Sequence, residues 1–313
     1  MARLAYKALI TDPVEKECIE RLSAAGIEVV EAYDLTKESL LEKIPEYDIL
    51  IVRSKTKVDK QVIERATKLK IIGRVGVGLD NIDVEEASKR KIKIVSTPEA
   101  STVAVAELVF AFLLSLARSI PRADSSMKQG KWIKKELHGF ELRGKTLGIV
   151  GFGRIGKAVA MRAKAFEMHV MAYDPFEPRE VFENLKIPRA GNLKELLSQS
   201  DIVSIHVPLT RETEHLFNEE MIFSMKPGAI LVNTSRGKVV DTKALLKALK
   251  TGHLLGAALD VYENEPPKEP WELELISLPN VIATPHIGAQ TVEAQRIGAI
   301  LIAENIIKTL SGS

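Results

Sequence analysis

The chain has 313 residues, 45% of them hydrophobic and 27% charged, and its 44 basic and 42 acidic residues leave a net charge of +2. This composition excludes a disordered or low-complexity chain, and so small a net charge does not indicate a protein that binds nucleic acid. The length predicts two domains with cores of their own. The single cysteine, Cys18, builds neither a disulfide within the chain nor a zinc cluster, so we expect no metal site and a cytoplasmic location.

No membrane segment or export signal is expected. The longest uncharged apolar run, residues 108–117, falls well short of the about 20 residues that a membrane span requires. The chain begins without the apolar stretch of a secretion signal and enters a strand-like run at once.

Up to about residue 97, short β-rich runs alternate with amphipathic stretches at the spacing of βα units. The run Ile49-Leu50-Ile51-Val52 is apolar without alternation, as in parallel strands that are covered on both faces. We therefore predict one open α/β sheet. Its expected strands are residues 8–11, 28–31, 49–52, 71–75 and 92–95, and its expected helices 17–24, 38–44, 62–66 and 84–89.

A second sheet is predicted further along the chain. A helix over 103–118 and a polar, lysine-rich segment over 119–144 come first, and the alternation restarts at Thr146. The expected strands are residues 147–150, 170–173, 202–206, 230–233, 255–260 and 281–283, which suit a dinucleotide fold. The last helix, 291–310, is expected to cross back onto the first sheet. The predicted domains are therefore 1–97 completed by 289–313, and 98–288.

The pattern G-x-G-x-x-G follows the first strand of the second sheet and opens a helical run. Gly151 suits a tight turn, Gly153 lets the backbone approach a pyrophosphate, and Gly156 lets helix and strand pack closely. The helix N-terminus presents N–H groups to phosphates. Asp174 ends the next strand, where a carboxylate accepts hydrogen bonds from ribose hydroxyls and favours NAD over NADP. The alternative is a glycine turn in a purely structural domain.

Three polar motifs follow later strands, at the edge where an open α/β sheet binds its ligand. They are residues 233–237, 260–267 and 284–288. Hydride transfer to a 2-keto acid needs a proton donor at the carbonyl oxygen and a fixed cation for the carboxylate. His286 and Arg236 are candidates for these roles.

Taken together, these motifs resemble those of the D-isomer-specific 2-hydroxyacid dehydrogenases. The resemblance runs from the loop Val52-Arg53-Ser54, through the run from Gly73 to Asn81, to the ending Pro285-His286-Ile287-Gly288. It implies an α/β protein with two doubly wound parallel sheets, namely a flavodoxin-like substrate domain and a Rossmann domain that binds NAD.

The resemblance also implies the roles of individual residues. Arg236 binds the substrate carboxylate, His286 exchanges a proton with the substrate oxygen, and Glu265 hydrogen-bonds the other ring nitrogen. The implied cofactor contacts are Val77, Thr102, Gly151, Gly153, Arg154, Ile155, Gly156, Asp174, Val207, Pro208, Thr213, Thr234, Asp260, His286 and Gly288. The implied substrate contacts are Arg53, Ser54, Val75, Gly76, Asn81, Arg236 and Lys134, although a plain surface lysine is an equal alternative at position 134.

The implied reaction is the oxidation of 3-phospho-D-glycerate to 3-phosphohydroxypyruvate with NAD, the first step of serine biosynthesis. Because the chain stops at Ser313, we expect no serine-sensing regulatory domain after it. The alternatives are a hydroxypyruvate or glyoxylate reductase, a D-lactate dehydrogenase, and a non-enzymatic corepressor that senses NAD. A homodimer or larger oligomer is expected because helix 103–118 and the Trp132 segment would otherwise expose an apolar patch.

Overall fold

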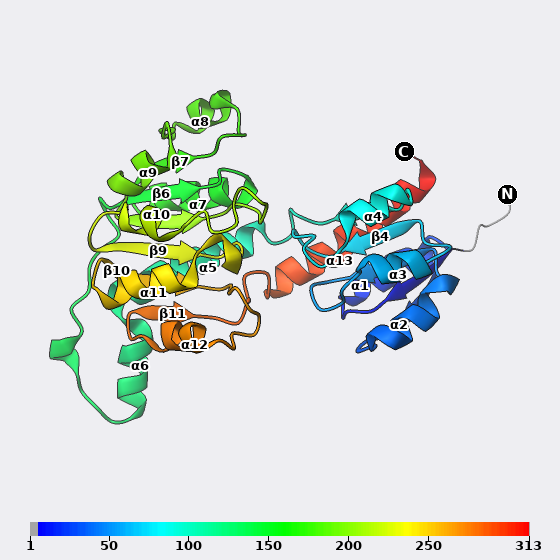
Figure 1. Ribbon diagram of the computed structural model, residues 1–313, viewed down its shortest axis with the longest axis horizontal. Coiled ribbons are helices and arrows are strands. Elements are labelled where there is room, and N and C mark those ends of the chain that lie inside the picture. Colours follow the sequence, from blue (N-terminus) through cyan, green and yellow to red (C-terminus); the bar gives the residue numbers. More distant parts are fainter. Residues whose placement is uncertain (1–5, 313) are drawn as a thin grey trace. The chain divides into compact units, whose positions relative to one another are not determined.

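The computed structural model describes residues 6–312. The chain forms two compact units (Figure 1). Unit 1 comprises the chain up to Ser101 together with the segment from Ala289 onward, and unit 2 is Thr102–Gly288. The chain therefore leaves unit 1, builds all of unit 2, and returns to unit 1.

Unit 1 contains a five-stranded parallel sheet in the order β2-β1-β3-β4-β5. This is the flavodoxin-like order, with β1 and β3 adjacent at the point where the order reverses. All four residues of β3 are buried, as the unbroken apolar run predicts. The strands are β1 (Lys7–Ile10), β2 (Glu28–Glu31), β3 (Ile49–Val52), β4 (Ile71–Arg74) and β5 (Lys93–Ser96).

Helices cover both faces of this sheet. On one face, α1 (Lys16–Ala24) and α13 (Val292–Ser311) share a core that includes Leu22 and Ile302. The other face carries α2 (Lys37–Lys43), η1 (Ile44–Glu46), α3 (Lys60–Arg65) and α4 (Val84–Lys89). A Cβ added at Gly73 in β4 would lie 3.0 Å from Ile306, so the absence of a side chain there lets α13 pack close to the strand.

Unit 2 contains a six-stranded parallel sheet in the order β11-β10-β9-β8-β6-β7. The dinucleotide-binding order usually has a further strand outside β7. Here that strand is reduced to a single parallel bridge between Arg189 and Ala172. The predicted fold class is confirmed in both units. The strands are β6 (Thr146–Val150), β7 (His169–Tyr173), β8 (Ile202–Ile205), β9 (Ala229–Asn233), β10 (Leu254–Leu259) and β11 (Val281–Ala283).

Two helical layers cover the sheet of unit 2. One layer comprises α5 (Thr102–Arg118), α7 (Arg154–Ala165) and α8 (Arg179–Leu185). The other comprises α9 (Leu193–Gln199), α10 (Glu219–Phe223), α11 (Thr242–Lys250) and α12 (Pro270–Ser277). The segment predicted only as polar and lysine-rich contains α6 (Ile120–Lys128) and η2 (Lys134–Glu136). A further short helix, η3 (Gly237–Val239), follows β9.

Within residues 6–312, no single helix is long and apolar enough to cross a membrane. The helices α5 and α6, which meet at 65°, are together long and apolar enough for a span, by length and composition alone. In the same described range, no group of three or more His, Cys, Asp or Glu side chains is arranged to hold a metal ion.

Candidate active site

The glycine turn after β6 lies where the strand order of unit 2 reverses, between β6 and β8. Gly151 has φ +92°, and a Cβ there would lie 2.6 Å from the carbonyl oxygen of His206. A Cβ at Gly156 would lie 2.2 Å from the carbonyl oxygen of Gly151, so strand and helix pack at backbone contact. Gly153 precedes α7, and a Cβ there would meet no atom within 4 Å.

These features fit a dinucleotide. The space beside Gly153 is open at the N-terminus of α7, where Arg154 and Ile155 begin the helix and the helix dipole favours a phosphate. Thr234, just after β9, has a buried hydroxyl oxygen with no hydrogen-bond partner in the protein. Such an atom is costly unless a ligand or water satisfies it.

Asp174 follows β7 and is held in place by backbone groups. Its Oδ2 accepts a hydrogen bond from Phe152 N–H at 2.8 Å, within the glycine turn. Its Oδ1 accepts from the N–H groups of Phe176 at 2.9 Å and Glu177 at 3.1 Å. The carboxylate expected to bind the ribose is therefore fixed next to the turn expected to bind the pyrophosphate.

The loop after β8 contains Val207, Pro208 and Thr213. Val207 borders Gly151, since a Cβ on that glycine would lie 3.0 Å from its side chain. The Thr213 hydroxyl donates to the Pro208 carbonyl at 2.6 Å and closes the loop. His206 bonds Ser204 at 2.8 Å, and burial lowers the pKa of His206 to about 3, so its ring stays neutral.

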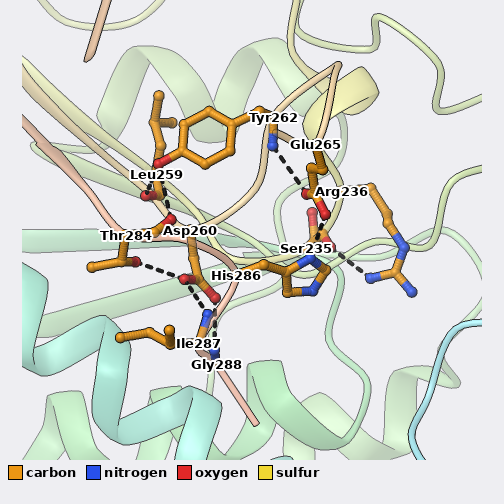
Figure 2. A network of polar contacts seen from close by, with 10 residues as sticks. All are labelled: Ser235, Arg236, Leu259, Asp260, Tyr262, Glu265, Thr284, His286, Ile287 and Gly288. Carbon is orange, nitrogen blue, oxygen red and sulfur yellow. Dashed lines mark hydrogen bonds and ion pairs between the residues drawn. The ribbon is translucent and has the colours of Figure 1, made fainter. Parts of the chain in front are cut away.

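Glu265 and His286 form a hydrogen-bonded pair between the loop after β10 and the loop after β11. The two side chains point toward each other, with 2.7 Å between His286 Nδ1 and Glu265 Oε2 (Figure 2). The other Glu265 oxygen accepts from Tyr262 N–H at 3.2 Å. Although burial favours the protonated acid, the hydrogen bond and charge of His286 hold the pKa of Glu265 below its usual range. His286 thus has an ionised partner on Nδ1.

A network around Asp260 holds the loop that carries His286. The carboxylate accepts from the Thr284 hydroxyl at 2.6 Å and from the N–H groups of Ile287 and Gly288, both at 2.7 Å (Figure 2). These hydrogen bonds lower the pKa of Asp260, but burial raises it by more, so the pKa lies above its usual value. Asp260, predicted as a cofactor contact, therefore also fixes the loop that carries His286. His286 itself has φ +53°, a left-handed conformation that the bonds on either side of it support.

Tyr262 and Arg236 complete the cluster. The Tyr262 hydroxyl donates to the Thr284 carbonyl at 2.9 Å, and burial raises the pKa of Tyr262 to about 12, so the phenol keeps its proton. Arg236 donates to the Ser235 carbonyl at 2.6 Å, and its charge contributes to the lowered pKa of Glu265. The loop after β9 thus carries a cation close to the Glu265–His286 pair.

The substrate residues predicted in the first domain lie on two loops of unit 1. Asp12, which is 1% exposed, accepts from Arg53 N–H at 2.6 Å and from the Thr56 hydroxyl at 2.7 Å. The Asn81 amide donates to the carbonyl oxygens of Arg53 at 2.8 Å and Thr56 at 2.6 Å. Asn81, predicted to face the substrate, thus holds the loop that carries Arg53 and Ser54.

The predicted residues divide between the two units. Those of unit 1 are Arg53, Ser54, Val75, Gly76, Val77 and Asn81. Gly76 has φ +131° and donates its N–H to the Thr97 hydroxyl at 2.8 Å. In unit 2, Thr102 begins α5 and Lys134 lies exposed on η2. Sequence reasoning missed Asp12 and Glu272, and it gave no role to Tyr262 and Thr284, although these two lie within the motifs 260–267 and 284–288.

Residues 110–288 match the family model for the D-isomer specific 2-hydroxyacid dehydrogenase, NAD binding domain. This match covers more than half of the chain, and the relatives described next extend over nearly all of it. The chain belongs to this family of NAD-binding dehydrogenases.

Two curated relatives and one crystal structure show how far the similarity extends. A D-3-phosphoglycerate dehydrogenase of Methanocaldococcus jannaschii is 50% identical over 98% of this chain, which spans 58% of that relative's length. A hydroxypyruvate reductase of Thermotoga maritima is 48% identical over 99% of both chains. The TT0316 protein of Thermus thermophilus is 40% identical, with a TM-score of 0.88 over 98% of this chain and 97% of that one.

Proposed function

We propose that this chain catalyses reversible hydride transfer at C2 of a D-2-hydroxy acid, with NAD as cofactor. The observation that carries the proposal is the pair Glu265–His286, at 2.7 Å, beside the cation of Arg236. An imidazole with an ionised carboxylate on one nitrogen is suited to exchange a proton through the other.

In the direction of reduction, His286 donates a proton from Nε2 to the keto oxygen. Glu265 holds the ring in orientation through Nδ1 and balances the positive charge. Arg236 binds the substrate carboxylate and thereby fixes the orientation of the substrate. NADH, when bound, supplies the hydride, and the 2-keto acid becomes a 2-hydroxy acid. Oxidation reverses each step, with His286 accepting the proton.

The remaining site residues hold the cofactor. The turn from Gly151 to Gly156 and the start of α7 bind the pyrophosphate, and Asp174 binds the adenosine ribose. The buried Thr234 hydroxyl, which lacks a protein partner, gains one when the cofactor is present. Asp260 keeps the His286 loop in place through three hydrogen bonds.

As the substrate pair we propose 3-phospho-D-glycerate and 3-phosphohydroxypyruvate, which makes the reaction the first step of serine biosynthesis. The 50% identity to the D-3-phosphoglycerate dehydrogenase of M. jannaschii supports this assignment. A phosphate needs cations besides Arg236, and Arg53, Arg74 and Lys134 are the candidates.

A cytoplasmic location stays a prediction.

A second candidate is reduction of an unphosphorylated acid such as hydroxypyruvate or glyoxylate. The hydroxypyruvate reductase of T. maritima supports it, because the similarity covers 99% of both chains. Purified protein with NADH, assayed on 3-phosphohydroxypyruvate, hydroxypyruvate, glyoxylate and pyruvate, separates the two. The highest kcat/KM on the phosphorylated acid supports the first candidate, and the highest on another acid supports the second. No turnover on any of the four would overturn the proposed activity.

The role of His286 is tested by His286→Ala. We expect kcat to fall on the order of 10²–10⁴-fold, because the proton donor is lost, while NADH still binds. His169→Ala, at the exposed start of β7, is the matched control and keeps full activity. Steady-state kinetics and NADH fluorescence titration measure the two effects. Wild-type kcat in the His286 variant would rule out the assigned role.

We also propose that the protein is a homodimer. The apolar helix expected to be exposed, α5, is instead largely buried against the sheet of unit 2. Apolar side chains on α6 and in the following segment are exposed, with Ile120 at 51%, Met127 at 57% and Trp132 at 77%. A second copy of the chain would cover them. Sedimentation at micromolar concentration checks the assembly, and a monomer would refute it.

A further inference from the structure

Glu272 is a buried carboxylate that the proposed chemistry does not use. It lies in the first turn of α12 and is 1% exposed. Isolated carboxylates are rarely buried to this extent, because loss of hydration disfavours the ion. The polar groups that surround Glu272 therefore call for an explanation.

Four hydrogen bonds to Glu272 come from the loop 264–269. Its Oε1 accepts from Asn264 N–H at 2.9 Å. Its Oε2 accepts from the Asn264 side-chain amide, Lys268 N–H and Glu269 N–H, each at 3.1 Å. Burial favours the protonated acid, but the hydrogen bonds prevail and lower the pKa of Glu272, so the side chain is ionised.

Helix capping explains only part of this arrangement. The bond from Glu269 N–H belongs to the capping box at the start of α12. Asn264 and Lys268 lie outside the helix, and their bonds pull the two ends of the loop onto a single carboxylate. Capping of α12 does not require the hydrogen bonds from Asn264 and Lys268.

Glu265 lies within this loop, directly after Asn264. One of its oxygens accepts from Tyr262 N–H and the other pairs with His286 Nδ1. Its side chain is 39% exposed, so packing around it contributes little to its orientation. The direction of the Glu265 carboxylate thus depends on how the loop backbone is held on both sides.

We propose that Glu272 is a positioning residue: its carboxylate fixes the 264–269 loop and thereby sets the Glu265–His286 hydrogen bond. This inference rests on the proposed function, in which that pair handles the proton. The other titratable groups facing the pair are Arg236, Asp260 and Tyr262. Glu263, just before the loop, pairs with His215 at 3.5 Å. All of these stay unchanged in the tests below.

The first test is Glu272→Gln. With its oxygen at the Oε2 position, the glutamine still accepts three of the bonds but turns an NH₂ group toward Asn264 N–H, next to Glu265. We expect kcat for keto-acid reduction to fall on the order of tenfold and the alkaline limb of the rate–pH profile to move to lower pH, because the protonated imidazole is less well stabilised. KM for NADH should stay within about twofold.

Glu274→Gln is the matched control, because Glu274 lies on the same helix but is exposed and pairs with Lys250 at 2.6 Å. It should keep the wild-type rate and pH profile. If Glu272→Gln fails to fold, Asn264→Ala decides instead, since it removes one anchor and leaves the carboxylate in place. We expect Asn264→Ala to shift the profile in the same direction by a smaller amount, and a wild-type profile would overturn the proposal.

The decisive comparison is a double-mutant cycle with Glu265→Gln. If Glu272 acts through Glu265, adding Glu272→Gln to Glu265→Gln changes neither the rate nor the pH profile further. Multiplicative losses in the double variant would overturn the inference. A wild-type enzyme without keto-acid turnover would refute the proposed function instead, so the two failures are distinguishable.

Discussion

Gly153 and Gly156 belong to one turn, but a methyl group at each would meet different surroundings. The Cβ of Gly153→Ala would enter open space, at a backbone conformation that alanine adopts, with φ −74°. We expect this variant to fold with an unchanged melting temperature but to bind NADH weakly, because the methyl group occupies the place proposed for the pyrophosphate.

Gly156→Ala should, in contrast, also destabilise the fold. Its Cβ would lie 2.2 Å from the Gly151 carbonyl oxygen, so α7 has to move away from β6. We expect a loss of about 1–3 kcal/mol in the free energy of unfolding, together with weaker NADH binding. Thermal unfolding and fluorescence titration of both variants check the contrast. Equal effects of the two substitutions would contradict it.

Asp201, just before β8, gives a pH-dependent prediction. Burial favours its protonated form, but hydrogen bonds from Lys226 and from Thr146 N–H prevail and lower the pKa of Asp201. A carboxylate whose pKa is lower in the folded state adds stability above its unfolded value, about 3.9, and loses that contribution as the pH falls through the folded value.

We therefore expect Asp201→Asn to cost about 1 kcal/mol of unfolding free energy near neutral pH. The difference from wild type should vanish in acid, where both proteins carry a neutral group at this position. Urea unfolding at a series of pH values measures the difference, and a cost that is the same at all pH values would exclude the ionic explanation.

At the level of elements, α13 provides the clearest packing test. Ile302 is fully buried in the core shared by α1, α13 and the sheet of unit 1, whereas Ile297 on the same helix is 45% exposed. Ile302→Ala should cost about 2–5 kcal/mol of unfolding free energy, because it leaves a cavity against β4. Ile297→Ala should cost far less. Chemical denaturation followed by far-UV circular dichroism compares the two, and equal costs would mean that α13 is not part of the core.

Hydrophobic pattern was enough to predict most elements to within a residue or two. The strands at 28–31, 49–52 and 281–283 end where the sequence predicted. Of the three, only 49–52 is an unbroken apolar run that is buried throughout, as expected of a parallel strand covered on both faces. Helix α6 was missed because charged and polar residues dominate it. The outer strand of the second sheet, reduced to the bridge at Arg189, has too few residues to show any periodicity.

Those site residues that belong to recognisable motifs could be predicted from the sequence. The contact between Glu265 and His286 was expected from the family resemblance, although 21 positions separate them. The roles of the residues that hold these groups were not, because Tyr262 and Glu272 mainly bond backbone atoms and Thr284 donates its hydroxyl to Asp260. Such bonds depend on how loops fold, and a side chain that makes them has no spacing of its own in the sequence.

At the scale of the whole molecule, the two tryptophans provide a selective probe. The chain has two, Trp132 and Trp271, and both belong to unit 2, whereas unit 1 contains Tyr6, Tyr33 and Tyr47. Tryptophan fluorescence therefore reports the unfolding of unit 2. NADH at 100 times its dissociation constant should stabilise the transition seen by tryptophan by about 2.7 kcal/mol. A transition that does not respond to NADH would contradict the proposed cofactor site.

The return of the chain to unit 1 also determines the order in which the protein can be built on the ribosome. Residues 102–288 are contiguous, so unit 2 can fold as soon as they emerge. The sheet of unit 1 is translated earlier, but Ile10, Ile51 and Ile71 lack their cover until Ile302 and Ile306 follow. Of the two units, the one whose sheet is translated first is thus the later one to complete its core, and during that interval its apolar face is open to chaperones and to aggregation.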